Sequence, residues 1–320
     1  MGRIPRIYQA NVVYEVTTRT IQGRFLLRPS PETNDLLSGI VGRAQSLLPS
    51  VKVYGLSVLS NHMTWMLSSS TPRDIPAFMG YVNGRISRDI GRLVDWPGKF
   101  FERPAMPIPI ADDDALLSRF SYLLSQGVKE NLVEKAEQWP GVSCVPSLLG
   151  KSTLEGTWYQ RDKMRRLFLR KHPPDKKQYT RKYTVQFSKL PGKEDLSEKD
   201  YVAFVQGLVT HIEREALNLR KQDGKPCLGP TKVQAVTPHH RPQKLAKSPA
   251  PRCHASTKAI RMLFVAAWKL LVQWFKDSSE ALKNFDLNVT FPDGSFPSPF
   301  PMAKEGEAQQ PILKKKGAVS

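Results

Sequence analysis

Two adjacent segments of β-branched and other apolar residues constrain the fold of this chain more than any other feature. Residues 51–59 and 62–67 both have the composition of strands, and a link of only two residues separates them. This spacing is typical of a β-hairpin. Because side chains alternate along a strand, His62 and Thr64 share one face of the second strand, and Trp65 points to the other face.

The rest of the first half predicts further strands and helices in a regular order. Residues 12–18 are rich in β-branched side chains and indicate a strand, and the proline-punctuated residues 100–110 indicate an edge strand. Helices are expected over residues 30–48 and 73–94, and from Asp112 onward. The order β-α-β-β-α-β-α contains the ferredoxin-like arrangement of an antiparallel sheet with helices on one face. We therefore predict an α+β fold.

The net charge of +19 is concentrated in the second half of the chain. Residues 1–150 contain 16 Lys and Arg against 13 Asp and Glu, a balance of +3, whereas residues 151–320 contain 32 against 16, a balance of +16. A surplus of this size attracts polyanions at long range. Nucleic acid is therefore the expected partner. Charge alone does not separate DNA from RNA.

The same asymmetry divides the chain into two predicted regions. Residues 1–150 are expected to form the sheet-containing domain, and residues 151–320 a basic, largely helical C-terminal extension with a disordered tail. Helices are predicted over residues 200–220 and 255–285.

Composition favours a soluble protein with a packed core. Hydrophobic residues make up 40% of the chain, but no apolar run approaches the roughly 18 residues that cross a bilayer. The three cysteines are scattered, which fits neither a disulfide framework nor a zinc knuckle. We expect a cytoplasmic protein that does not associate with membranes.

The helix that begins after Asp112 carries a polar stripe that its apolar face does not need. At about 100° per residue, Phe120 and its apolar neighbours fall on one arc, and Arg119, Tyr122 and Gln126 fall on the opposite arc. A tyrosine in an amphipathic helix usually packs into the core. Here the apolar arc is complete without Tyr122, so core packing and a chemical role both stay open.

Two other sets of residues also allow a structural and a functional interpretation. A lone strand histidine such as His62 is more often a hydrogen-bonding residue than a metal ligand, and Thr64 is a weak ligand because its hydroxyl is neutral. On the helix that follows the hairpin, Arg85, Arg88 and Arg92 line up on one face. Such a row is either a solvated charged surface or a phosphate-binding surface.

These segments, in this order, resemble the single-tyrosine HUH transposases, in particular the REP-associated tyrosine transposases, over roughly residues 8–150. Residues 53–62, VYGLSVLSNH, resemble the strand that enters the family's Asn-His-hydrophobic-His motif. Residues 116–133, LLSRFSYLLSQGVKENLV, resemble its catalytic-tyrosine helix, and residues 139–143, WPGVS, resemble its Trp-Pro-aromatic-Ser ending.

The resemblance implies metal-assisted cleavage and strand transfer on single-stranded or hairpin DNA. Tyr122 would attack a phosphate and form a 5′-phosphotyrosine, while His62 and Gln126 would bind Mg²⁺ or Mn²⁺. Thr64 stands where the family has its second metal-binding histidine. Basic side chains would hold the DNA, and we expect these to be Arg85, Arg88, Arg92 and Arg119.

Thr64 keeps other functions open. One alternative is a DNA-binding protein that keeps the fold and no longer cuts, and a weaker one is an RNA-binding protein in which Tyr122 is incidental. A histidine from the second half could complete the metal site, and the candidates are His211, His239, His240 and His254. The resemblance is compatible with a monomer or a homodimer, and with a cytoplasmic protein that joins the nucleoid when it binds DNA.

Overall fold

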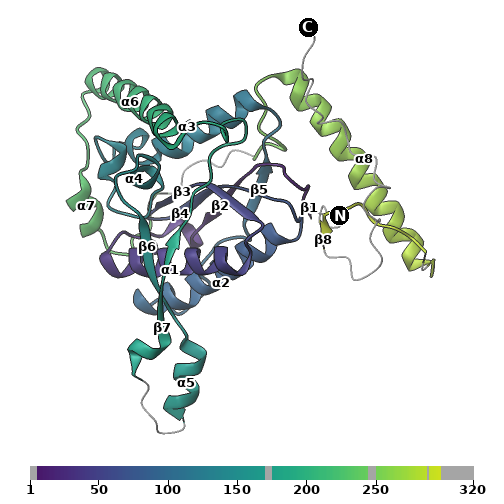
Figure 1. Cartoon of the computed structure of the whole chain (residues 1–320), viewed down its shortest axis with the longest axis horizontal. Coiled ribbons are helices and arrows are strands. Elements are labelled where there is room, and N and C mark those ends of the chain that lie inside the picture. Colours follow the sequence, from purple (N-terminus) through teal and green to yellow (C-terminus); the bar gives the residue numbers. More distant parts are fainter. Residues whose placement is uncertain (1–5, 170–174, 244–249, 287, 297–320) are drawn as a thin grey trace.

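The computed structural model describes residues 6–169, 175–243, 250–286 and 288–296. At its centre is a four-stranded antiparallel sheet in the order β3-β4-β2-β5 (Figure 1). The strands are β2 (Tyr14–Arg19), β3 (Val51–Leu59), β4 (His62–Ser69) and β5 (Met106–Pro109). β3 and β4 form the predicted hairpin, with Leu59 opposite His62, and β5 lies at an edge of the sheet, as expected.

Helices cover both faces of this sheet. On one face lie α1 (Pro31–Leu47) and α2 (Asp74–Leu93), where Trp65 of β4 packs edge-to-face on Phe78 of α2 with ring centroids 5.8 Å apart. On the other lies α3 (Asp113–Lys129), whose Phe120 shares a core with Met66 of β4. The strand order and the two helices on one face are ferredoxin-like. The predicted α+β fold class is confirmed, and α3 adds a layer on the opposite face.

The helices begin where the sequence places caps. The Ser30 hydroxyl accepts a hydrogen bond from the Thr33 N–H at 3.1 Å, and a carboxylate oxygen of Asp112 accepts one from the Ala115 N–H at 2.8 Å. These bonds satisfy donors that the first turn of a helix leaves unpaired. The caps therefore define the start of both α1 and α3.

The second half combines helices with one hairpin. The hairpin consists of β6 (Leu154–Tyr159) and β7 (Thr180–Val185), which enclose α5 (Arg161–Leu169) and the 3-10 turn η3 (Lys176–Tyr179). The predicted helices are found as α6 (Glu198–Asp223) and α8 (Lys258–Lys283). The remaining elements are β1 (Arg6–Ile7), η1 (Ile21–Gly23), η2 (Ala136–Gln138), α4 (Val145–Leu148), α7 (Pro230–Ala235) and β8 (Ser295–Phe296).

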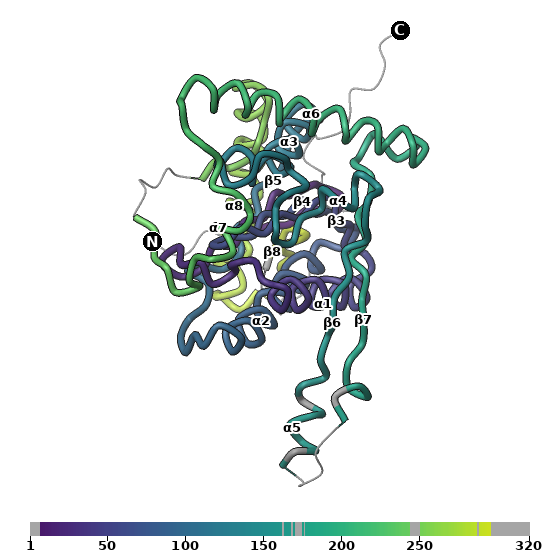
Figure 2. The backbone as a smooth tube through the Cα atoms, turned by 90° about the vertical axis from the view of Figure 1, so that its left-hand side faces the viewer, coloured from purple at the N-terminus to yellow at the C-terminus, as the bar shows by residue number. Residues whose placement is uncertain are grey.

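The elements of the second half pack onto those of the first. α6 lies on α3, and β6 and β7 lie along α1 (Figures 1 and 2). The predicted disordered tail falls mostly on residues 297–320, outside the described residues. Among the helices that are described, none has the length and apolarity that a membrane-spanning segment requires.

The β6–β7 hairpin approaches α1 at a distance that only glycine permits. A Cβ on Gly39 would lie 2.2 Å from the carbonyl oxygen of Thr157, and a Cβ on Gly156 would lie 2.2 Å from that of Asp35. The N–H and the hydroxyl of Thr157 both donate to Oδ1 of Asp35, at 3.1 and 3.0 Å. Backbone contact and hydrogen bonds thus fix the base of the hairpin on α1.

Gly39→Ala is expected to lower the free energy of unfolding by about 1–3 kcal/mol, because the new methyl group forces the hairpin away from α1. The control is Gly80→Ala on α2, where a Cβ meets nothing within 4 Å. There the better helix propensity of alanine should raise the free energy of unfolding by up to about 1 kcal/mol. Urea denaturation measures both. Equal stabilisation by the two substitutions would contradict the close contact.

Candidate functional site

The face of the sheet beneath α3 carries polar side chains on two neighbouring strands. In the β2–β4 register, Arg19 lies opposite His62, Thr17 opposite Thr64, and Glu15 opposite Met66. Opposed residues of an antiparallel pair point to the same face, and Met66 belongs to the core that contains α3. The polar residues therefore lie on the α3 side. His62 therefore faces the same side of the sheet as the helix that carries Tyr122.

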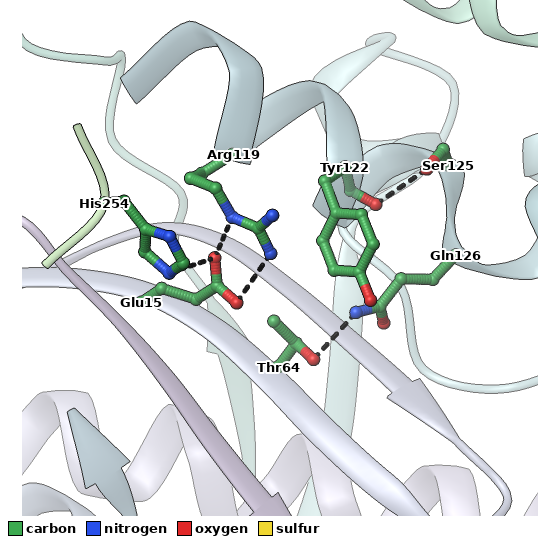
Figure 3. A network of polar contacts seen from close by, with 7 residues as sticks. All are labelled: Glu15, Thr64, Arg119, Tyr122, Ser125, Gln126 and His254. Carbon is green, nitrogen blue, oxygen red and sulfur yellow. Dashed lines mark hydrogen bonds and ion pairs between the residues drawn. The ribbon is translucent and has the colours of Figure 1, made fainter. Parts of the chain in front are cut away.

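Gln126 contacts this face directly. Its Nε2 donates a hydrogen bond of 2.8 Å to the Oγ1 of Thr64, and both side chains are buried (Figure 3). The other end of the amide, Oε1, is buried without a hydrogen-bond partner among the described residues. Gln126, one of the two expected metal ligands, is thus joined to Thr64, which stands where the resembled family has its second metal-binding histidine.

One helical turn before Tyr122, Arg119 forms a two-pronged ion pair with Glu15 of β2 (Figure 3). Its Nη2 donates to Oε1 of Glu15 at 2.9 Å, and its Nε donates to Oε2. Nε2 of His254 lies 3.4 Å from Oε2 of the same carboxylate. Burial lowers the pKa of His254, and the charge of Arg119 acts in the same direction, while Glu15 opposes both.

Tyr122 lies between these two groups and points toward the sheet (Figure 3). The Arg119 guanidinium stands 4.0 Å from the ring centroid, and the Lys129 ammonium stands 5.0 Å from it. Both contacts are cation–π interactions. The side chain is half-buried, and its hydroxyl forms no hydrogen bond with the described residues. The ring is held by cations while the hydroxyl stays free to meet an anion.

His62 lies at one end of the polar face, where it is paired with Arg19 of β2. Its Nδ1 lies 2.7 Å from Oδ1 of Asn61, and because a carboxamide oxygen only accepts, Nδ1 is the protonated nitrogen. Burial, with a smaller contribution from Arg19, lowers the pKa of His62 to about 4. The ring is therefore neutral at neutral pH, and Nε2 keeps a lone pair.

Of the four other candidate histidines, only His254 reaches the α3 side of the sheet through a described contact. His239 contacts the carbonyl of Val94, His240 stacks on Phe25, and His211 is exposed on α6. His254 meets Glu15, which is four residues from Arg19 along β2. Since a strand rises about 3.4 Å per residue, roughly 13 Å separates the His254 end from the His62 end.

The arginine row of α2 lies on the face of the sheet opposite to α3. Arg85 is 6% exposed, and its Nη2 lies 3.2 Å from Oδ2 of Asp89 and donates to the Tyr159 carbonyl at 3.1 Å. Arg85 therefore links α2 to the β6–β7 hairpin and is not available to DNA. Arg88 and Arg92 are exposed. Of the four predicted DNA-binding arginines, only Arg119 lies beside Tyr122.

The donors that the structure brings together do not make a complete site for a resident divalent ion. His62 offers one imidazole nitrogen and Gln126 one amide oxygen, whereas Thr64 adds a neutral hydroxyl. Magnesium in proteins is usually held through carboxylates. The carboxylate on this face, Glu15, is engaged by Arg119. These groups alone therefore do not fit a resident Mg²⁺ ion.

Comparison with known proteins gives similarities of fold at low identity. The chain is similar to a REP-associated tyrosine transposase bound to a REP hairpin, with 14% identity, a TM-score of 0.40, and coverage of 47% of this chain and 87% of that one. It is also similar to a candidate transposase from Deinococcus radiodurans R1, with 16% identity, a TM-score of 0.28, and coverage of 39% and 96%. No protein-family model and no curated protein matches the chain. Neither similarity assigns a family or an activity to it.

His62→Gln is expected to flatten the pH dependence of stability below neutral pH. The pKa of His62 is about 4 in the folded chain against 6.5 as the ordinary value, so between these values the unfolded chain binds a proton that the folded chain does not. Stability from this group is complete above pH 6.5 and falls toward pH 4, by up to about 1.4 kcal/mol per unit. Urea denaturation across that range measures it. An unchanged slope in His62→Gln would refute the assignment.

Arg119→Met is expected to lower the free energy of unfolding by about 2–4 kcal/mol, because it leaves the Glu15 carboxylate buried without its partner. The double variant Glu15→Leu, Arg119→Met should recover most of that loss. Lys129→Met, which removes the other cation beside Tyr122, should change stability by less than about 0.5 kcal/mol, since Lys129 is exposed. If the effects of Glu15→Leu and Arg119→Met, measured singly, add up in the double variant, then Arg119 and Glu15 are not coupled.

Proposed function

We propose that this chain binds single-stranded or hairpin DNA through a transposase-like domain and does not cut it. The observation that carries the proposal is the buried hydrogen bond of 2.8 Å between Gln126 and Thr64. An amide that bonds to a hydroxyl has only one end left for any other partner. Cleavage needs a complete set of donors for an ion, whereas binding needs only cations and polar groups that face the strand.

The charge distribution and the surroundings of Tyr122 support the DNA-binding part. The chain carries a net charge of +19, and phosphate contacts dominate nucleic-acid affinity. Beside Tyr122, the exposed Lys129 and the free tyrosine hydroxyl are both able to donate to a phosphate oxygen. Arg119 is tied to Glu15, so its role is to orient the Tyr122 ring.

A second candidate function is cleavage by Tyr122, and one observation favours it. Oε1 of Gln126 is buried without a hydrogen-bond partner among the described residues, and a buried acceptor of this kind suits an ion or a substrate group. In this reaction the Tyr122 oxygen would bond to phosphorus and the bond to the 3′ oxygen would break, which releases a 3′-hydroxyl. If the chain cleaves DNA in this way, we expect the reaction to require Mg²⁺ or Mn²⁺.

The test is incubation of the full chain with labelled hairpin DNA and either ion, followed by a native and a denaturing gel. We expect a shifted complex on the native gel and no covalent adduct on the denaturing gel. An adduct that Tyr122→Phe abolishes would overturn the proposal and establish the second candidate. A structured RNA that binds as tightly as the DNA hairpin would instead favour the RNA-binding alternative.

The variant Thr64→His tests whether the residue at position 64 is the single reason that the chain binds DNA without cleaving it. The substitution replaces the hydroxyl partner of Gln126 with an imidazole on the same face as His62. We expect an adduct with Mn²⁺ in this variant, because imidazole is a far better ligand than a neutral hydroxyl. The matched control is the double variant Thr64→His, Tyr122→Phe, which should form none. Absence of an adduct in Thr64→His would mean that other parts of the site have also changed.

A further inference from the structure

The helix α8 carries many apolar side chains and buries few of them. Twelve of its 26 residues are Val, Leu, Ile, Met, Phe or Trp, and of these twelve only Val272 is buried. Met262, Leu263 and Leu270 are 61%, 73% and 73% exposed. A helix normally buries its apolar residues against a neighbour, and exposed apolar patches mark interaction sites.

One side of α8 is covered by segments of its own chain. The Arg252 guanidinium lies 4.8 Å from the Trp268 ring centroid, and Phe275 packs on Phe291 with ring centroids 5.4 Å apart. Figure 1 shows α8 at the margin of the molecule, away from the central sheet. The residues on the opposite side of the helix are exposed.

The exposed side carries apolar residues at the spacing of a coiled-coil seam. At about 100° per residue, four exposed residues fall on one narrow arc, at intervals of four, three and four: Ala259, Leu263, Ala266 and Leu270. Alternating intervals of this kind let two helices pack along their whole contact. The same arc continues through Gln273 and Asp277, which are also exposed. These six residues are called the α8 stripe here.

The exposed side does not have the composition of a helix that lies on a membrane. Such a helix presents its Trp and Phe residues to the bilayer and its Lys and Arg residues to the headgroups. In α8, Trp268 and Phe275 face segments of the same chain. The exposed side also carries Asp277 and Glu280, which an anionic membrane surface repels. Another helix is therefore the better occupant.

The charges on this side fit a second copy of α8 in the antiparallel direction. Lys258 lies at its N-terminal end, and Asp277 and Glu280 lie at its C-terminal end. None of the three forms an ion pair with described residues. A parallel pair would place Asp277 against its own copy, whereas an antiparallel pair places both acids near Lys258 and the positive end of the other helix dipole. Lys269 and Lys276, at the margin of the stripe, are long enough to keep their charge in solvent.

We propose that two copies of this chain form a dimer through the α8 stripe, with the two helices antiparallel. When the six positions are aligned in opposite directions, Ala266 of each copy faces Leu270 of the other, and Leu263 faces Gln273. Small residues that face large ones let the helices interlock, and a two-fold interface of this kind is self-complementary. Of the monomer and the homodimer that the sequence allows, the stripe favours the homodimer.

The first test measures the mass of the full chain by light scattering after size-exclusion chromatography, at increasing protein concentration. The wild type should reach twice the 36.1 kDa of one chain. The stripe variant Leu263→Glu, Leu270→Glu should stay monomeric, with a dissociation constant raised by about a hundredfold or more, because its dimer would enclose four carboxylates. The control variant Leu217→Glu, Leu219→Glu, on α6, replaces leucines that are 45% and 61% exposed and should remain dimeric. Melting temperatures check that both variants are folded.

The second test determines the direction of the two helices. Chains with Ala259→Cys are mixed with chains with Asp277→Cys and oxidised. These positions are about 27 Å apart along the helix axis, so the two directions give different products. The antiparallel dimer should yield disulfides between the two different variants, whereas a parallel dimer would join each variant to itself. The wild type, in which Cys144 and Cys253 are buried, is the blank.

Four results would overturn the inference. They are a wild-type mass of one chain at every concentration, a stripe variant that dimerises as the wild type does, equal loss of the dimer in the stripe and control variants, and disulfides that join each cysteine variant only to itself. A monomeric wild type that binds anionic lipid vesicles, when the stripe variant does not, would make the stripe a membrane surface instead. None of these results bears on the proposed function, which depends on the α3 side of the sheet.

Discussion

The ion pair between Arg119 and Glu15 fixes how α3 lies on the sheet, and the other groups of the site take their positions from it. A carboxylate that is 5% exposed requires a partner, and two parallel hydrogen bonds from a guanidinium set an orientation as well as a distance. With Arg119 held on β2, the next turns of the same stripe bring Tyr122 and Gln126 toward the sheet. The apolar arc of α3 then faces α6 and β3.

Burial explains why Gln126 binds Thr64. A primary amide enclosed between a helix and a sheet loses about 1–3 kcal/mol for each polar atom that it leaves unpaired. Thr64 has a short side chain, and its Oγ1 accepts a hydrogen bond from Nε2 of Gln126 at 2.8 Å. The amide is thereby positioned by the protein, with no need for an ion. The bond satisfies only half of the amide, and the remaining oxygen is the point at which the site is still able to accept a ligand.

Local signals predicted the elements, but contacts over long sequence distances determined what each side chain does. The hairpin at 51–67, the caps of α1 and α3 and the polar stripe of α3 follow from short-range patterns. Arg85 was expected on a phosphate-binding face. Its partner Tyr159 lies at the end of β6, 74 residues later in the chain, and the sequence gives no signal for that contact. Glu15 was missed for the same reason, although a charged residue inside a strand of β-branched residues was the available hint. His254 was only one of four candidate histidines, and the sequence gives no signal for its contact with Glu15.

The order of contacts along the chain also explains how the β6–β7 hairpin and α6 come to lie on opposite sides of a single sheet. After β7 the chain passes the outer strand β3, where the Ser188 N–H donates to the Val53 carbonyl at 2.8 Å. It then reaches α6 on the α3 side. The segment near Ser143 pairs with Ser57 of the same strand. An edge covered in this way is protected from pairing with other chains. The same segment connects the β6–β7 hairpin on the α1 side of the sheet to α6 on the α3 side.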